Sequence, residues 1–292
     1  MLHLIIGGAG CGKSTRLIGQ IRKAYEQGER IYALVPEQYS FTNDLKLYEA
    51  LGPTAFNAIQ SLSFTSLARS LFQQYGGRSG EYADDLTKTI LLYQSIRALS
   101  DSSAFSHFDR QAKKPAFQDA AAKAITELRR GSISPEALLE QTARLEGRLR
   151  DKAADLAVLY GDYDRRLREK GYKDSLTDIT EAAALCAGNE HFKGAVLFLD
   201  EFESFTGDQM EFLDVLFAQA KELWITLRTE DPEAPAYSVF DATNATYRRL
   251  LALAQKHRTR HEILLCKEPF RFRYPDPVSY THLRAHETLS DL

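Results

Sequence analysis

Two kinds of hydrophobic pattern alternate over the first 77 residues of the chain. Short, nearly continuous apolar runs predict buried strands, and stretches with an apolar residue at every third or fourth position predict helices. The strands are expected at residues 2–6, 31–35 and 58–63, and the helices after residue 14, at 42–51 and at 64–75. Gly28 and Pro36 stand where the first helix and the second strand should end. This alternation is typical of an α/β domain with a parallel sheet.

The pattern changes between residues 78 and 175, where strand-like runs vanish and helical periodicity dominates. Helices are expected there at 86–99, 115–130, 135–145 and 148–170. The α/β pattern then returns, with helices at 179–186, 208–219 and 247–257 and strands at 195–199, 223–227 and 262–266. We therefore expect one α/β domain, made of residues 1–77 and 176–277, that is interrupted by an all-helical insertion subdomain at 78–175.

Composition narrows the class of protein only a little. The chain has 292 residues, of which 44% are hydrophobic and 26% charged, as in ordinary globular proteins. A net charge of −3 gives no basic excess, so nucleic-acid binding would need a local patch or a partner subunit. Cys11, Cys186 and Cys266 lie too far apart for a metal motif, which favours a reducing cytoplasm. The longest apolar stretch, at 195–199, is too short to cross a membrane.

Residues 7–14 read Gly-Gly-Ala-Gly-Cys-Gly-Lys-Ser, which fits the phosphate-binding motif G-x-x-x-x-G-K-[ST]. The motif stands between a predicted strand and a predicted helix, the context that it requires. Backbone N–H groups of such a loop surround a phosphate, and the helix N-terminus adds partial positive charge. Lys13 is placed to reach the β- and γ-phosphates of ATP, and the Ser14 hydroxyl to ligate Mg²⁺. The expected ATP-binding residues here are Gly7, Gly8, Ala9, Gly10, Cys11, Gly12, Lys13, Ser14 and Thr15.

An acidic pair supplies the expected second half of the site. The buried strand at 195–199 ends in Asp200-Glu201, so it delivers two carboxylates to the edge of the sheet where the loop also lies. Asp200 would hold Mg²⁺ through water, and Glu201 would orient or deprotonate an attacking water. An acidic turn without a catalytic role is the alternative.

Residues after other strands are expected near the same edge. Gln38 follows the second strand and is a candidate nucleotide contact. Either Thr226 or Arg228 should form the exposed tip of the strand at 223–227. For Phe202 and Phe205, packing in the core is favoured over contact with a nucleic-acid base.

These pieces, in this order, resemble the AddB family, the B subunits of bacterial AddAB ATP-dependent helicase/nucleases. The resemblance covers residues 1 to about 277. It is carried by the phosphate loop, the helical insertion, and the segments Leu-Val-Pro-Glu-Gln at 34–38, Phe-Leu-Asp-Glu-Phe-Glu-Ser-Phe-Thr at 198–206 and Ile-Thr-Leu at 225–227.

The resemblance implies a superfamily-1-like helicase fold, in which a helical subdomain interrupts a RecA-like domain. It implies ATP binding by Lys13 and Ser14, a Mg²⁺-linked acid at Asp200, an AddA-like partner subunit, and action on double-stranded DNA ends in recombinational repair. Many members have glycine after that aspartate, whereas this chain has Glu201, which leaves open whether ATP is hydrolysed or only bound.

The resemblance also implies a longer protein. Members of the family continue into a nuclease domain with an iron–sulfur cluster held by four cysteines, and this chain contains no such part. Residues 279–288 instead resemble translated sequencing-adapter read-through, so we interpret 278–292 as a non-native tail. The chain is expected to be a truncated gene product that is inactive by itself.

Two other functions stay open. A small-molecule kinase with a phosphate loop would close a helical lid with clustered arginines over the phosphates, but Arg129-Arg130 and Arg165-Arg166 fit solvated helix faces. A non-catalytic scaffold could keep the nucleotide as a structural ligand, although it would have no need for Glu201.

Overall fold

The computed structural model describes residues 1–59, 61–77, 80–234 and 238–267, so the tail interpreted as non-native lies outside the described residues. The chain divides into two compact units. Unit 1 consists of Met1–Phe64, Glu190–Phe205 and the chain from Leu216 onward. Unit 2 consists of Thr65–Asn189 and Thr206–Val215.

Unit 1 is built on a six-stranded sheet in the order β3-β2-β6-β7-β1-β8, and all its neighbouring strands pair in parallel. The strands are β1 (Leu2–Gly7), β2 (Ile31–Leu34), β3 (Ser61–Leu62), β6 (Val196–Leu199), β7 (Glu222–Arg228) and β8 (His261–Cys266). The apolar runs therefore predicted strands correctly, although only two residues of the expected run at 58–63 pair. The α/β prediction is confirmed.

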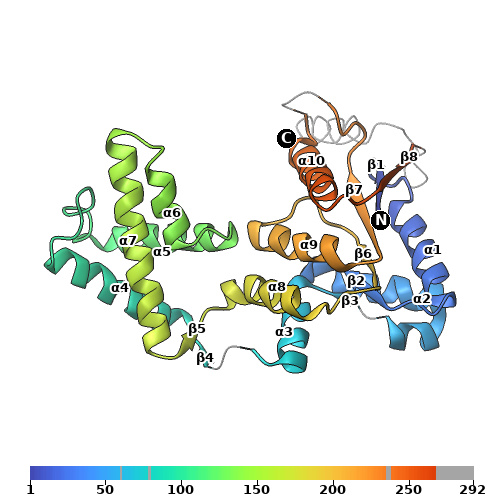
Figure 1. Cartoon of the computed structure of the whole chain (residues 1–292), viewed down its shortest axis with the longest axis horizontal. Helices are drawn as coiled ribbons and strands as arrows, with labels where there is room; N and C mark the ends of the chain where they lie inside the picture. Colours follow the sequence, from blue (N-terminus) through green and yellow to red (C-terminus); the bar gives the residue numbers. More distant parts are fainter. Residues whose placement is uncertain (60, 78–79, 235–237, 268–292) are drawn as a thin grey trace, which may run out of the picture. The chain divides into compact units, whose positions relative to one another are not determined.

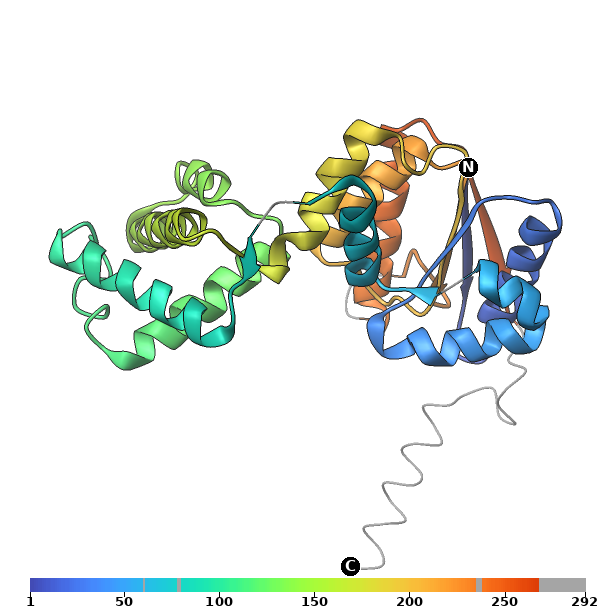
Figure 2. The ribbon, with the colours of Figure 1, turned by 90° about the horizontal axis from the view of Figure 1, so that it is seen from below.

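Helices cover both faces of this sheet. Helices α1 (Lys13–Glu26) and α2 (Ser40–Ala58) lie on one face and α10 (Asp241–Lys256) on the other (Figure 2). The periodic residues Leu17, Ile21 and Ala24 of α1 are buried, which explains why this segment is a helix against the sheet. Gly28, with a φ of 69°, ends α1, and its N–H donates to the Tyr25 carbonyl.

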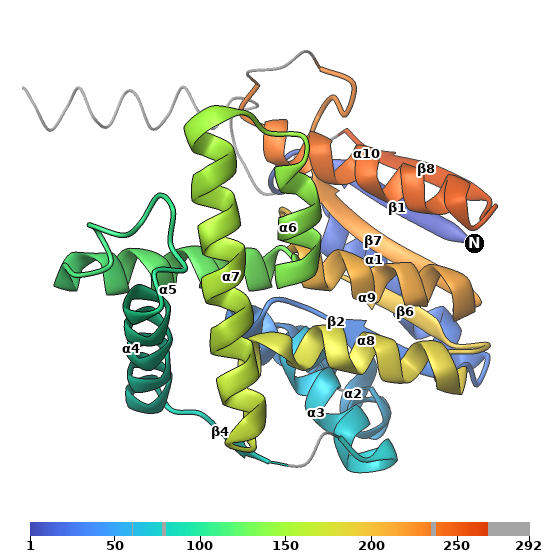
Figure 3. The same ribbon diagram turned by 60° about the vertical axis from the view of Figure 1, so that its left-hand side comes forward.

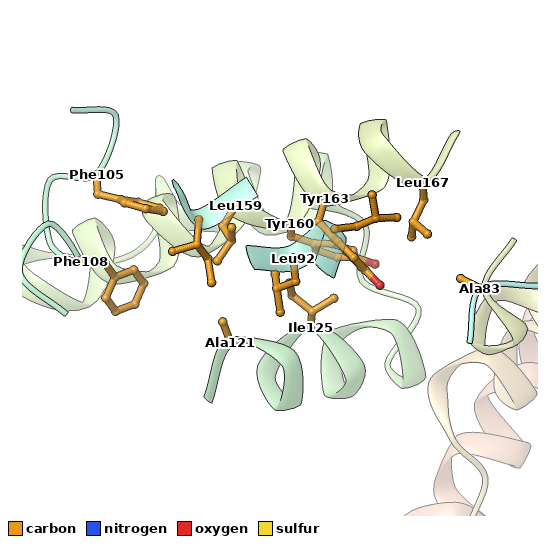
Figure 4. Close-up of a cluster of buried hydrophobic side chains, with 12 residues drawn as sticks. Ala83, Leu92, Phe105, Phe108, Ala121, Ile125, Leu159, Tyr160, Tyr163 and Leu167 are labelled. Carbon is orange, nitrogen blue, oxygen red and sulfur yellow. The ribbon is translucent and has the colours of Figure 1, made fainter. Parts of the chain in front are cut away.

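Unit 2 is largely helical (Figure 1). Helix α6 lies along the long helix α7, and α4 also packs against α7 (Figure 3). The helices that lie wholly or mostly in this unit are α3 (Phe64–Tyr75), α4 (Asp85–Asp101), α5 (Pro115–Arg130), α6 (Pro135–Thr142), α7 (Gly147–Glu169), α8 (Asp178–Asn189) and α9 (Gly207–Gln219). Figure 4 shows Ala121 and Ile125 of α5 pointing toward Leu92 of α4 and toward Tyr160 and Tyr163 of α7. The helical periodicity of the sequence thus located these helices correctly.

The segment at 78–175 is not all-helical, and in this respect the prediction was wrong. Strands β4 (Glu81–Tyr82) and β5 (Tyr172–Lys173), near its two ends, pair in parallel. The stretches that lead into and out of this segment are therefore extended and adjacent, and their backbone groups hydrogen-bond to each other. Unit 2 is also wider than the predicted insertion, since it starts at Thr65 and includes Thr206–Val215.

A buried carboxylate fixes the loop after α4. Asp155 of α7 is 4% exposed and accepts hydrogen bonds from the backbone N–H groups of Ser106, His107 and Phe108 over 3.1, 2.7 and 2.9 Å. The Ser106 hydroxyl donates to the same carboxylate over 3.1 Å. Because Asp155 satisfies three backbone donors at once, the loop is attached to the helical core through this one side chain.

We expect Asp155→Ala to lower the free energy of unfolding of unit 2 by roughly 3 kcal/mol, because it leaves three backbone donors, one of them buried, without their acceptor. Denaturation followed by far-UV circular dichroism should show an earlier loss of helix. The fluorescence of Trp224, the chain's sole tryptophan and part of β7 in unit 1, reports on unit 1 separately. Asp151→Ala, which removes a half-exposed carboxylate near the start of the same helix, is the control and should unfold like the parent. Equal unfolding of Asp155→Ala and parent would contradict this role.

Candidate phosphate-binding site

The loop between β1 and α1 has the backbone that the motif requires. Gly10 and Gly12 have φ values of 74° and 77°, a region that glycine adopts at low cost. Gly12 is the N-cap of α1 and offers no side-chain cap, so the N–H groups of the first helical turn remain available to an anion. Ser14 and Thr15 lie in this turn, half-buried and exposed respectively. The loop therefore fits a phosphate.

Close neighbours explain the two glycines at the start of the loop. A Cβ atom on Gly7 would lie 2.4 Å from the carbonyl oxygen of Cys266, the residue that pairs with it on β8. A Cβ atom on Gly8 would lie 2.6 Å from the Oε1 atom of Glu230. A side chain at Gly7 would collide with the backbone of β8, so this position requires glycine. At Gly8 a Cβ atom would displace the end of the exposed Glu230 side chain. Among the other loop residues, Ala9 is exposed and Cys11 is buried.

Lys13 points back over the loop. Its ammonium donates to the Gly8 carbonyl over 2.6 Å, which holds the charge beside the backbone that would surround a phosphate. Burial lowers the pKa of this ammonium, and the charges of Cys11, Asp200 and Glu201 oppose the shift. The charges of Asp200 and Glu201 thus act on Lys13, and the assignment of all three residues to a nucleotide site stays a prediction.

Asp200 follows β6 directly and is 3% exposed. Its Oδ1 atom accepts a hydrogen bond from the Thr226 hydroxyl over 2.5 Å, and its backbone N–H donates to Leu34. Its Oδ2 atom is buried and has no hydrogen-bond partner in the described part of the chain. A buried carboxylate oxygen without a hydrogen-bond partner fits the coordination of a cation or of a cation-bound water. The donor set of Asp200 and Ser14 therefore fits Mg²⁺ once phosphate oxygens complete it.

Thr226 is buried rather than at the exposed tip of its strand, because its hydroxyl is used by Asp200. Arg228 forms that tip instead, where it is exposed and pairs with Glu203. Of the two alternatives, Arg228 was correct.

Glu201 has an unusual backbone and a cationic neighbour. Its φ is 64°, in the left-handed region that favours glycine, and its Oε1 atom lies 3.3 Å from the Nζ atom of Lys46 on α2. A glycine at this position would adopt the same backbone without strain.

Other predicted residues divide into two groups. Gln38 is exposed in the short 3₁₀ helix η1 (Glu37–Tyr39), directly after β2, and two strands separate β2 from β1. Its contact with a nucleotide stays a prediction. Phe202 and Phe205 are buried and pack edge-to-face against Phe64, with ring centroids 5.7 and 6.3 Å away. The expectation of core packing for these two rings is confirmed.

The arginine pair at 129–130 was misread as a solvated helix face. Arg130 is exposed, but Arg129 is 5% exposed and pairs with Asp164 and Asp174. The rings of Tyr160 and Tyr163 lie 5.5 and 5.3 Å from its guanidinium carbon. Arg129 lies on the same face of α5 as the buried Ala121 and Ile125, and the four residues brought together by the fold neutralise and cover its charge.

Three neighbours of the site went unrecognised in the sequence: Lys46, Glu230 and Cys266. They reach the loop or Glu201 through strand pairing and helix packing, for which no local motif exists. Among the described residues, no group of three or more His, Cys, Asp or Glu side chains could hold a metal by protein ligands alone. Within the same residues, no helix has the length and apolar character needed to cross a membrane.

Comparisons with known proteins agree with the geometry. The family model described as "ADDB, N-terminal" matches residues 4–279. The B subunit of the ATP-dependent helicase/deoxyribonuclease of Clostridium perfringens (strain SM101 / Type A) is 31% identical over 260 residues, 87% of this chain and 22% of that protein. The protein of the same name from Clostridium acetobutylicum is 29% identical over 286 residues, 96% of this chain and 24% of that protein.

A third relative, from Clostridium botulinum (strain Hall), carries the same name and is 32% identical over 232 residues, 78% of this chain and 20% of its own length. The chain thus spans between a fifth and a quarter of the length of these relatives. With the match to the family model over nearly the whole sequence, this similarity shows that the chain belongs to the AddB N-terminal family.

Proposed function

We propose that the chain is the nucleotide-binding, helicase-like N-terminal portion of a helicase/deoxyribonuclease subunit that acts on double-stranded DNA ends in recombinational repair. The names of the relatives support ATP-dependent work on DNA and a subunit that functions with a partner, which we propose is AddA-like. The chain covers 22% of the first of these relatives, so we propose for it the role of one portion of such a subunit.

The observation that carries the proposal is the unpartnered Oδ2 atom of Asp200 at the same sheet edge as a glycine cradle and Lys13. Backbone N–H groups of the loop and Lys13 bind the β- and γ-phosphates of ATP. Ser14 and Asp200 hold Mg²⁺, which supplies positive charge to the phosphates. Glu201 is the carboxylate that orients water.

The alternative of a small-molecule kinase has less support. Arg129, one of the arginines that could form a lid over the phosphates, already pairs with two aspartates. A scaffold without turnover remains the second candidate, because Glu201 pairs with Lys46.

Asp200→Asn tests the metal half of the site. The parent chain should bind a fluorescent ATP analogue more tightly with Mg²⁺ than without it. The substitution should remove most of that enhancement, about tenfold in affinity, because the amide lacks the charge that attracts the cation. Glu203→Gln, in the same loop but paired with exposed Arg228, should keep it. An unchanged Mg²⁺ effect in Asp200→Asn would refute the assignment, and a parent that binds no nucleotide would refute the proposed function.

A further inference from the structure

Glu230 is an exposed carboxylate that lies directly on the phosphate loop. Its Oε1, Cγ and Cδ atoms lie 2.6, 3.3 and 3.4 Å from the position that a Cβ atom of Gly8 would occupy. The carbonyl of the same Gly8 accepts the hydrogen bond of the Lys13 ammonium. Gly8 thus has a cation on its carbonyl and an anion on the side where a Cβ atom would stand.

Buried neighbours hold the backbone on both sides of Glu230. Thr229 is fully buried, and its hydroxyl donates to the Oδ1 atom of Asn244 over 2.7 Å. The Nδ2 atom of Asn244 donates to the carbonyl of Asp231 over 3.0 Å, and Asn244 itself is 1% exposed. A single asparagine of α10 therefore fixes the residue before and the residue after Glu230. These contacts hold the chain that carries Glu230 beside the loop.

Among the described residues, none of the cations named above pairs with the Glu230 carboxylate. Lys46 pairs with Glu201, and Arg228 pairs with Glu203. Lys13 already lies near both predicted carboxylates, Asp200 and Glu201. A triphosphate bound in the loop would add several negative charges within a few ångströms of the Glu230 carboxylate. At such distances like charges repel appreciably, and the repulsion is reduced when a divalent cation accompanies the phosphates.

We propose that Glu230 is a specificity-determining residue of the nucleotide site, which disfavours free polyphosphate and restricts binding to the Mg²⁺ complex of the nucleotide. This inference rests on the proposed function, because it assumes that the loop binds a nucleotide. Glu230 lies outside the phosphate-binding motif, and it distinguishes the nucleotide with bound Mg²⁺ from the more negatively charged nucleotide without it.

The test is equilibrium binding of a fluorescent ATP analogue to the full 292-residue chain, with Mg²⁺ or with a chelator. Glu230→Gln should tighten binding of the Mg²⁺-free analogue about fivefold and that of the Mg²⁺ complex less than twofold. The gain should shrink at high ionic strength, because salt screens the repulsion. Glu233→Gln removes the same charge from the same exposed segment away from Gly8 and should leave both affinities unchanged.

Asn244→Ala provides a second variant, since it releases the backbone on both sides of Glu230. Asn244→Ala should tighten binding of the Mg²⁺-free analogue less than Glu230→Gln does. Added to Glu230→Gln, it should tighten that binding no further. If Glu230→Gln binds the Mg²⁺-free analogue as tightly as the parent or more weakly, the inference is overturned. The proposed function is still upheld in that case, provided that the parent binds the analogue and that this binding depends on Lys13. A parent chain that binds no nucleotide overturns both.

Discussion

Lys13→Ala is expected to abolish detectable nucleotide binding by the chain. The ammonium donates to Gly8 over 2.6 Å and is the loop's own cation, so its removal deletes a charge-assisted phosphate contact. Such a contact contributes roughly 1.5–3 kcal/mol, and its loss leaves the phosphate charge beside the carboxylates of Asp200 and Glu201. Titration of a fluorescent ATP analogue, with circular dichroism as a check on folding, measures the effect.

Lys23→Ala is the matched control for this experiment. Lys23 lies in the last turn of the same helix, α1, and is exposed, so its loss removes one positive charge far along the helix from the loop. The control should bind the analogue like the parent. If Lys13→Ala bound with the affinity of the parent, the phosphate site would have to lie elsewhere and the assignment of the loop would be wrong.

The elements that the sequence predicted well are those whose signal is local. The apolar run before the loop is a strand because its side chains are buried on both faces of a parallel sheet, and β1 is buried along all of its length. Helix α1 shows its buried face as residues three and four apart. The phosphate loop and the acidic pair each had a local signal in the sequence, and they follow two strands, β1 and β6, of the same sheet.

The features that the sequence did not predict depend on pairs of residues far apart in the chain. Strands β4 and β5 have two residues each, too few for a pattern, and they pair across about ninety residues of chain. Arg129 stands four residues after Ile125 on the buried face of α5, but a charged side chain suggests exposure until the two aspartates that pair with it are known. The position of Glu230 on Gly8 follows from the placement of a loop by Asn244, for which no motif exists.

The roles of the remaining candidates, Ser14, Thr15 and Gln38 among them, stay predictions. Their positions agree with a nucleotide site, but position shows only that the side chains are available. The carboxylate of Glu201 is different, because its backbone and its partner bear directly on whether ATP is hydrolysed.

Glu201→Gln should spare ATP binding and reduce hydrolysis about a hundredfold in a protein of full length, assembled with its partner subunit. Loss of a carboxylate that orients or deprotonates water has an effect of this order, whereas phosphate binding depends on the loop and Lys13. The partner must carry its own inactivating substitution, because its hydrolysis would mask the effect. DNA-stimulated phosphate release is the measurement, and a kinase would show phosphate transfer to a small molecule without a response to DNA.

The geometry of Glu201 sets the expected level of activity in the parent. The side chain leaves a backbone with a φ of 64° and lies 3.3 Å from Lys46, a half-exposed ion pair of about 1 kcal/mol at most. In this arrangement Lys46 competes with water for the carboxylate, so we expect ATP to be bound and turned over slowly or not at all. Glu201→Gly, which suits the same φ, is the control and should bind ATP like Glu201→Gln. If the parent and both variants hydrolyse ATP equally fast, Glu201 is not the water-orienting group. If none of them hydrolyses it, ATP is a bound ligand only, and the scaffold function is the correct one for this protein.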